Sequence, residues 1–237
     1  MTALAALTLA AAPVLHGSAS AAPTCFGQPA TIEGTEGDDF ITGTPGPDVI
    51  VGLGGNDYIE GGRGKDRICG GDGIDGMSGD QGRDRLFGGE DSDQPIQGGK
   101  GNDFLFGGPG SNDFLDGGPG DDELDGGTGE DIASFSLSEF GIRADLREGT
   151  ASGDGSDHLT RIESLMGSAL VDTLLGDRGA NDLRGSEGND VVRGRAGDDT
   201  LAGEDGDDAL GGGKGTDSAD GGAGTDECSA ETTAACE

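Results

Sequence analysis

The chain has 237 residues, 52 of which are glycine, and its formal net charge is -33 at pH 7. Because only 31% of the residues are hydrophobic and 4% aromatic, no thick core can form, and such a chain stays disordered unless something outside it supplies the missing free energy. The acidic balance argues against nucleic acid and anionic lipid as partners and favours cations.

The first stretch, residues 1–22, is rich in Ala and Leu and contains no acidic residue. It ends close to Ala19-Ser20-Ala21, which matches a signal-peptidase site, so we expect a signal peptide and a secreted, extracellular protein. No Lys or Arg precedes the apolar run, and an Ala-rich leader without structure is the alternative. The run is too short to span a bilayer, and no other apolar segment is long enough. Residues 23–33 are expected to form an N-terminal cap.

Two arrays of nine-residue repeats follow this cap. Residues 34–134 divide into eleven units, two of which have one additional residue: GTEGDDFIT, GTPGPDVIV, GLGGNDYIE, GGRGKDRIC, GGDGIDGMS, GDQGRDRLF, GGEDSDQPIQ, GGKGNDFLF, GGPGSNDFLD, GGPGDDELD and GGTGEDIAS. Residues 167–229 divide into seven: GSALVDTLL, GDRGANDLR, GSEGNDVVR, GRAGDDTLA, GEDGDDALG, GGKGTDSAD and GGAGTDECS. Residues 135–166 join the arrays, and residues 230–237 are expected to be a C-terminal tail.

An aspartate recurs at the sixth position of the units, or one place later in GGPGSNDFLD, and Asn181 is the exception. A carboxylate that returns to one phase of a Gly-rich repeat is a candidate metal ligand. The candidates are Asp39, Asp48, Asp57, Asp66, Asp75, Asp84, Asp93, Asp103, Asp113, Asp122, Asp131, Asp172, Asn181, Asp190, Asp199, Asp208, Asp217 and Asp226.

These units resemble the GGxGxDxUx nonapeptide of the RTX (repeat-in-toxin) calcium-binding family, in which U is a large apolar residue. The resemblance covers about 200 of the 237 residues and includes the joining segment, which looks like the irregular stretch between two RTX arrays. It implies an all-β fold, a parallel β-roll (β-solenoid), with calcium ions held between stacked turns.

The repeat also has a direct physical interpretation. Glycines at positions one, two and four permit positive φ angles, so six residues can turn sharply while the last three form a short strand with position eight facing inward. Two units then make one coil, and units eighteen residues apart stack at roughly 4.8 Å. Asp39 lies over Asp57 and Asp75 in such a stack, and Asp48 lies over Asp66.

A column of carboxylates this close is strongly repulsive, and a hard dication with about 6 to 8 oxygen ligands relieves the repulsion. Calcium is preferred because magnesium demands stricter octahedral geometry, whereas zinc favours Cys or His. Pairs of units separated by two allow at most about fourteen inter-turn ions. A flexible Gly/Asp linker is the alternative, but a linker needs neither a fixed register nor inward Ile and Leu.

Departures from the repeat indicate weak points. GGEDSDQPIQ places Asp91 where Gly is expected and Pro95 in the strand. Leu170 replaces the second turn glycine of its unit, and Asn181 should bind metal more weakly because it lacks a charge. In the joining segment, alternation of apolar residues over 142–146 predicts longer strands, and residues 149–157 are expected to form a loop.

Other chemistry is scarce. His158 is the only histidine after the leader, so an HExxH protease is excluded and we expect no enzyme. The Asp/Gly run over residues 121–126 imitates part of an EF-hand loop, but no flanking amphipathic helices are expected. Thr35, Thr44 and Thr128 do not align into one long row, which argues against an ice-binding surface. A calcium-dependent binding module for polysaccharide or a cell surface stays open, as does an enzyme of unrecognised type.

Four cysteines in an exported chain suggest disulfides, with three connectivities. We favour Cys25 with Cys69 and Cys228 with Cys236, each clamping one end of the roll. Free buried thiols are the alternative. The sequence therefore predicts a secreted protein that binds multiple calcium ions and folds on binding them.

Overall fold

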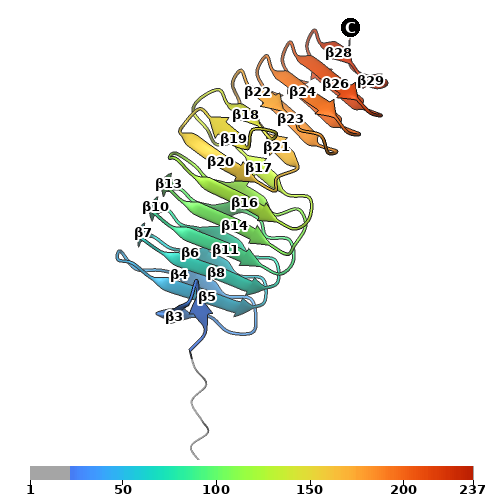
Figure 1. Ribbon diagram of the computed structural model, residues 1–237. Coiled ribbons are helices and arrows are strands. Elements are labelled where there is room, and N and C mark those ends of the chain that lie inside the picture. Colours follow the sequence, from blue (N-terminus) through green and yellow to red (C-terminus); the bar gives the residue numbers. More distant parts are fainter. Residues whose placement is uncertain (1–21, 237) are drawn as a thin grey trace, which may run out of the picture.

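A computed structural model describes residues 22–236, and these residues form an all-β, parallel β-solenoid without helices (Figure 1). The expected signal peptide lies outside the described residues except for Ala22. No helix in residues 22–236 has the length and apolar character needed to cross a membrane. The parallel β-roll predicted from the repeats is thereby confirmed.

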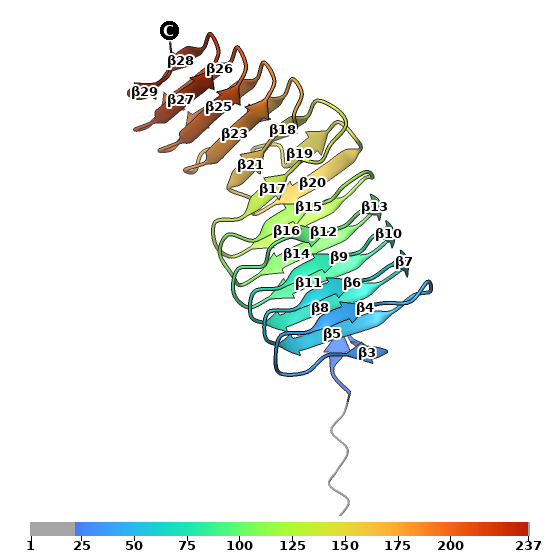
Figure 2. The ribbon, with the colours of Figure 1, turned by 180° about the vertical axis from the view of Figure 1, so that it is seen from behind.

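Two long sheets form the opposite faces of the solenoid, which Figure 2 shows from behind. The thirteen strands of the larger sheet, from its N-terminal edge, are β3 (Ile32–Glu33), β5 (Val49–Gly54), β8 (Arg67–Asp72), β11 (Arg85–Gly89), β14 (Phe104–Gly108), β16 (Glu123–Gly127), β20 (Ser156–Thr160), β19 (Thr150–Ser152), β18 (Arg143–Asp145), β22 (Thr173–Leu175), β24 (Val191–Ala196), β26 (Ala209–Lys214) and β28 (Glu227–Ser229).

The eleven strands of the second sheet are β4 (Phe40–Thr42), β6 (Tyr58–Glu60), β9 (Gly76–Ser78), β12 (Ile96–Gln97), β15 (Phe114–Asp116), β17 (Ile132–Ser134), β21 (Ser164–Met166), β23 (Asp182–Glu187), β25 (Thr200–Asp205), β27 (Ser218–Ala223) and β29 (Thr232–Ala234). A short sheet along one edge contains β7 (Arg63–Gly64), β10 (Gln81–Gly82) and β13 (Lys100–Gly101), and an N-terminal hairpin contains β1 (Thr24–Cys25) and β2 (Gln28–Pro29).

The core is a ladder of single apolar residues from position eight of each unit. Ile50 pairs with Ile68 and Ile68 with Leu86 in the larger sheet, and each of these side chains is fully buried. Ile59 and Met77 repeat the arrangement in the second sheet. Because consecutive units alternate between sheets, residues eighteen apart stack, as the nine-residue period predicts.

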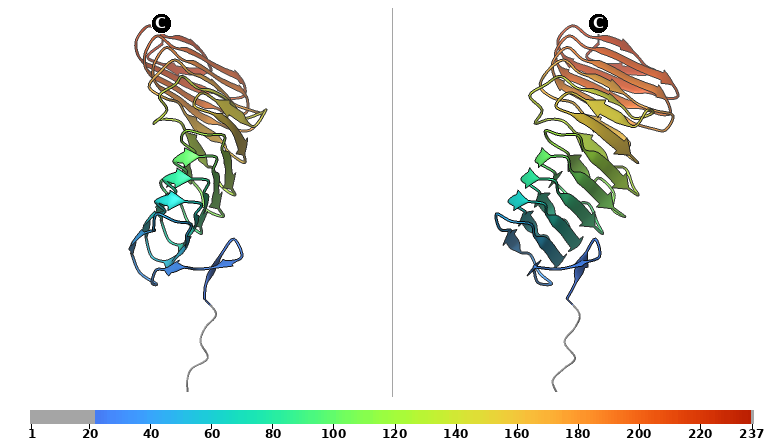
Figure 3. Two further views of the ribbon diagram at one scale, coloured as in Figure 1. Left: turned by 90° about the vertical axis from the view of Figure 1, so that its left-hand side faces the viewer. Right: turned by 60° about the vertical axis from the view of Figure 1, so that its left-hand side comes forward.

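The joining segment differs in part from its prediction. Residues 149–157, expected to be a loop, instead form β19 and begin β20, and β19 pairs antiparallel with both β18 and β20. The strands of this segment are also no longer than those of the arrays. Figure 3 shows the stack of coils changing direction near this segment.

Two ion pairs attach the joining segment to the arrays. The guanidinium of Arg161 binds Asp125 of β16, in the first array, through two hydrogen bonds. Arg195 of β24, in the second array, donates two hydrogen bonds of 2.7 Å to the carboxylate of Asp145. The side-chain bonds from Arg195 hold the pKa of Asp145 below its usual value.

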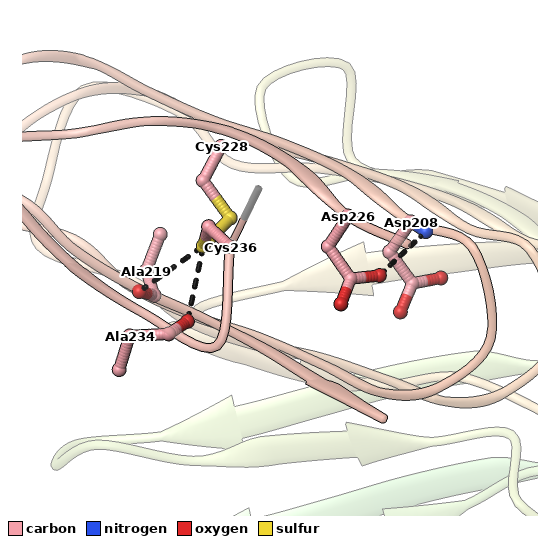
Figure 4. The surroundings of a disulfide bond; sticks show 6 residues. All are labelled: Asp208, Ala219, Asp226, Cys228, Ala234 and Cys236. Carbon is pink, nitrogen blue, oxygen red and sulfur yellow. Dashed lines mark hydrogen bonds between the residues drawn. A yellow bond between two sulfur atoms is a disulfide. The ribbon is translucent and has the colours of Figure 1, made fainter. Parts of the chain in front are cut away.

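Both disulfides have the predicted pairing. Cys25 of the hairpin is bonded to Cys69 of the larger sheet, and Cys228 to Cys236, each with a Cα–Cα distance of 5.7 Å. Figure 4 shows the second bond close to Asp226 and Asp208, at the last coil. Residues 230–236, which we expected to be a tail, include β29, which pairs in parallel with β27. Both ends of the solenoid are therefore tied covalently.

Candidate metal centre

The turn carboxylates are linked from coil to coil by one of their two oxygens. The N–H of Asp48 donates to Oδ1 of Asp66 (2.8 Å), and the N–H of Asp66 donates to Oδ1 of Asp84 (2.8 Å). On the other edge, Asp39 and Asp57 donate in the same way to Asp57 and Asp75. Two columns of stacked carboxylates result, as the repeat period predicts.

Three acidic residues of these columns were not predicted from the sequence. Oδ1 of Asp157 accepts the N–H of Asp122 (3.1 Å), and carboxylate oxygens of Glu163 and Glu231 accept the N–H groups of Asp131 (3.0 Å) and Asp217 (2.9 Å). A signal for Asp157 was present, because residues 152–160 read SGDGSDHLT, a repeat unit that lacks only its first glycine. Glu163 also lies in the nine-residue register, nine residues before Asp172 and two before the buried Leu165, whereas Glu231 has no comparable signal.

The second carboxylate oxygen, Oδ2, has no hydrogen-bond donor in fourteen of the units, and in each it is buried. An unpaired buried carboxylate oxygen costs several kcal/mol unless a cation compensates it. The residues concerned are Asp57, Asp66, Asp75, Asp84, Asp93, Asp103, Asp113, Asp122, Asp131, Asp190, Asp199, Asp208, Asp217 and Asp226. Nine belong to the first array and five to the second.

The first two units of each array differ, because their own turns satisfy the equivalent oxygen. The N–H groups of Thr35, Thr44 and Ser168 donate to Oδ2 of Asp39, Asp48 and Asp172, each at 2.6 Å. The N–H of Asp177 donates to Oδ1 of Asn181 (2.9 Å). We call these four units the leading turns. The other fourteen are the interior turns.

Backbone conformation at position two separates the same two groups. In every interior turn this residue has a positive φ, whether it is glycine, as in Gly62 (91°), or not, as in Leu53 (87°) and Arg195 (78°). In the described chain, none of the four leading turns has a positive φ there. The left-handed conformation directs the N–H at position two away from the turn carboxylate, which leaves Oδ2 without a donor.

Two departures noted in the sequence follow from this division. Leu170 replaces the second turn glycine without strain, because position four of a leading turn has no positive φ. The amide of Asn181 has a partner for each atom, since Oδ1 accepts from Asp177 and Nδ2 donates to the carbonyl of Glu163 (3.1 Å). Asn181 thus fits its turn through hydrogen bonds and leaves no oxygen unpaired.

The glycine at position one has a different role from the one expected. No first-position glycine has a positive φ, so conformational freedom does not explain it. Lack of space for a side chain explains it. A Cβ on Gly70 would lie 2.1 Å from Oδ2 of Asp75 and 2.7 Å from the carbonyl oxygen of Gly88 in the next coil. The carboxylate and a backbone carbonyl therefore converge on the space that the absent side chain leaves open.

The oxygen ligands at a turn are sufficient for a calcium ion only if backbone carbonyl oxygens are counted together with the carboxylate oxygens. Within residues 22–236, no three Asp, Glu, His or Cys side chains converge on one point. A site must therefore combine an unpaired Oδ2 with carbonyl oxygens of adjacent coils. An all-oxygen set with several backbone carbonyls is suited to calcium, which accepts about 6 to 8 such ligands in flexible geometry.

Comparison with known families agrees with this chemistry. A family model described as RTX calcium-binding nonapeptide repeat (4 copies) matches residues 31–46, 42–77, 70–94, 98–133, 166–201 and 175–210, together more than half of the chain. The chain belongs to the RTX calcium-binding repeat family. A search of curated proteins finds no match to it. Calcium binding by an RTX β-roll is the function that the family implies, and its repeats are generally structural and not enzymatic.

Many turn carboxylates in the interior turns of this RTX roll have raised pKa values. Removal from water is the main cause, the N–H from the neighbouring coil opposes it, and adjacent carboxylates add to it. The pKa reaches about 8 for Asp93 and Asp122, and about 7 for Asp75, Asp84 and Asp190. In the roll without metal, a large fraction of these groups is therefore protonated at neutral pH.

The raised pKa values give the calcium-free RTX roll a defined pH dependence. In the unfolded chain these groups titrate near 3.8, so their protonation stabilises the roll fully below that pH, and the stabilisation is lost as pH rises through about 7 to 8. In EDTA, the far-UV circular dichroism of the roll should therefore strengthen between pH 8 and pH 5.5. Saturating calcium should remove this dependence, whereas a β-signal that weakens on acidification in EDTA would contradict it.

The space at position one can be tested with a matched pair of glycines. A Cβ at Gly79 would lie 2.6 Å from the carbonyl oxygen of Gly98 and 2.8 Å from Oδ2 of Asp84, whereas a Cβ at Gly211 would meet nothing within 4 Å. Gly79→Ala should raise the calcium concentration at the folding midpoint, since it displaces two oxygens. Gly211→Ala should leave it unchanged. Equal midpoints in calcium titrations followed by circular dichroism would refute this role of the first glycine.

Proposed function

We propose that this chain is a secreted RTX β-roll that folds by binding about fourteen calcium ions, one at each interior turn. The supporting observation is that fourteen buried Oδ2 atoms lack a donor, and that they occur only in turns whose second residue has a positive φ. The fourteen interior aspartates are the proposed side-chain ligands. Asp39, Asp48, Asp172 and Asn181, which we predicted as ligands, are assigned instead to closing the first turns of each array.

Calcium supplies two things that the chain lacks. Fourteen dications would cancel most of the formal charge of -33, which removes the self-repulsion that opposes compaction. They would also compensate carboxylate oxygens that are otherwise buried without a partner. Because the unfolded chain has no preformed site, the free energy of binding becomes free energy of folding.

This dependence suits an extracellular protein. RTX repeat proteins are typically secreted, and the two disulfides indicate an oxidising environment. Sites of this kind in extracellular modules bind with dissociation constants of roughly 10⁻⁴ to 10⁻³ M. Such sites stay empty at cytosolic calcium, so the chain would fold after export.

A structural role is also favoured over catalysis. His158, the one histidine of the mature repeats, lies in β20 with an exposed side chain, opposite Glu123 of β16 and Thr150 of β19. Among the described residues, no carboxylate forms an ion pair with it. We therefore assign the protein to calcium-dependent structure.

Calcium should convert the mature protein from a disordered chain to a compact roll. The test is a calcium titration followed by far-UV circular dichroism and small-angle scattering, with magnesium as the control. The β-signal should increase and the radius of gyration should decrease together, at calcium concentrations near the millimolar range. A calcium-free protein that is already compact and β-rich at pH 8, or an equal response to magnesium, would overturn the proposed function.

Ion stoichiometry should distinguish interior from leading turns. Asp84→Asn removes an unpaired buried oxygen, whereas Asp48→Asn changes a residue whose Oδ2 already accepts from Thr44, and Asn181 shows that asparagine fits such a turn. Native mass spectrometry should count about fourteen ions for the wild type and for Asp48→Asn, and one or two fewer for Asp84→Asn. Identical losses in both variants would reject the distinction.

A further inference from the structure

Four cations form a compact group in the first array. Lys65 and Arg83 occupy position five of two turns that stack on one another, and Arg67 and Arg85 occupy position seven. Arg67 and Arg85 are direct Cα partners in the parallel strands β8 and β11. We call these four residues the basic grid.

The basic grid is not explained by stability. Like charges directly opposite each other on neighbouring strands are destabilising, and adjacent strands lie only about 4.8 Å apart. None of the four side chains forms an ion pair in residues 22–236, where the three ion pairs involve Arg161, Arg184 and Arg195. In an acidic protein, four neighbouring cations without a carboxylate partner remain available for an external anion.

Balancing the turn carboxylates does not explain the grid either. Burial raises the pKa of Asp103, and the charge of Arg83 opposes that rise, so Arg83 lies within electrostatic reach of the column. The equivalent positions of the larger sheet in the second array, however, hold no cation, although the same column of aspartates runs beside them. Those positions are occupied by Val171, Asn189, Asp207 and Thr225 at position five, and by Thr173, Val191, Ala209 and Glu227 at position seven.

The grid lies in a preformed groove with an aromatic neighbour. A groove of about 610 Å³ runs across the turns that contain the grid and on past Phe104. The guanidinium of Arg85 lies 4.2 Å from the ring centroid of Phe26 and 5.3 Å from that of Phe104. Phe26 follows Cys25, whose bond to Cys69 fixes the hairpin against the sheet. Arg85 is thus held in place before any ligand binds, which reduces the entropy lost on binding.

Bound calcium would change the net charge of the groove from negative to positive. Asp66, Asp84, Asp103 and Asp122 also line it, and together with Asp121 and Glu123 they outnumber the four cations. All four turn aspartates belong to the interior turns with an unpaired Oδ2. Bound calcium would neutralise them and leave the basic grid dominant, with Asp121 and Glu123 at one end only. This step rests on the proposed function.

We propose that the basic grid is a calcium-dependent binding site for an acidic polysaccharide, recognised through its carboxylate or sulfate groups. Arginine is suited to both anions because its planar fork donates two hydrogen bonds to one group. A single polysaccharide strand can follow a groove while it avoids the acidic remainder of the surface. An anionic membrane or a nucleic acid duplex presents a broad negative surface, which the net charge of -33 would repel.

Isothermal titration calorimetry can test this proposal with oligogalacturonate as the carboxylated probe, dextran sulfate as the sulfated probe and neutral dextran as the control. The test variant is Lys65→Gln/Arg83→Gln, since both side chains are exposed and position five varies freely among the repeats. The matched control is Arg178→Gln/Arg193→Gln, which removes two cations of the second array that also form no ion pair. Circular dichroism in calcium confirms that each protein folds.

The wild type and the matched control should bind one or both acidic probes in calcium and neither in EDTA. The test variant should bind about tenfold more weakly, the effect of losing charge-assisted hydrogen bonds. The probe that binds identifies the anion. A folded wild type that binds neither probe, a test variant with unchanged affinity, or binding to phosphatidylglycerol vesicles in place of polysaccharide would overturn the proposal. A wild type that does not fold in calcium would overturn the proposed function instead, and circular dichroism distinguishes the two failures.

Discussion

The structure depends on the two carboxylate oxygens of each turn aspartate, because the two have different partners. One oxygen accepts the backbone N–H of the preceding coil, at 2.8 Å from Asp66 to Asp84, and so sets the stacking of coils. The other is buried without a donor in fourteen turns. The interaction that builds the solenoid therefore also creates its electrostatic problem, because each added coil of two units buries two more turn carboxylates. The calcium ions proposed between coils would compensate these carboxylates as the stack grows.

The leading turns show how the same repeat can end such a column without metal. A Thr, Ser or Asp at position two adopts an ordinary φ and turns its N–H toward the carboxylate, as Thr44 does with Asp48. This change needs no alteration in the rest of the unit, since the strand and the inward residue are retained. Both arrays begin in this way, so the turn side chains of each first coil, including the amide of Asn181, are satisfied without an ion.

The sequence predicted the period, the inward residues and the stacking, because all of these follow from register. It also predicted both disulfides, because the cysteines lie near the two ends of the roll. It could not predict the division between leading and interior turns. GTPGPDVIV and GLGGNDYIE both hold a non-glycine residue at position two, yet Leu53 has a positive φ and Thr44 does not. Whether the residue at position two adopts a positive φ depends on contacts with the neighbouring coil. The sequence of a single unit does not contain these contacts. Glu231 was missed for the same reason, since it enters its column through three-dimensional position and not through a motif. Glu163 lies in the nine-residue register, but residues 158–166 lack the turn glycines that mark a unit.

The joining segment interrupts one of the two columns and is attached to the arrays by ion pairs. On the side of the eleven-stranded sheet the column continues, since Glu163 accepts from Asp131 and its carbonyl accepts from Asn181. On the side of the thirteen-stranded sheet the hairpin of β19 and β20 interrupts it between Asp157 and Asp172. Both ion pairs of the segment, Arg161 with Asp125 and Arg195 with Asp145, lie on this interrupted side. Arginine thus supplies positive charge where the column offers no interior turn, and two direct ion pairs attach the joining segment to the arrays on this side.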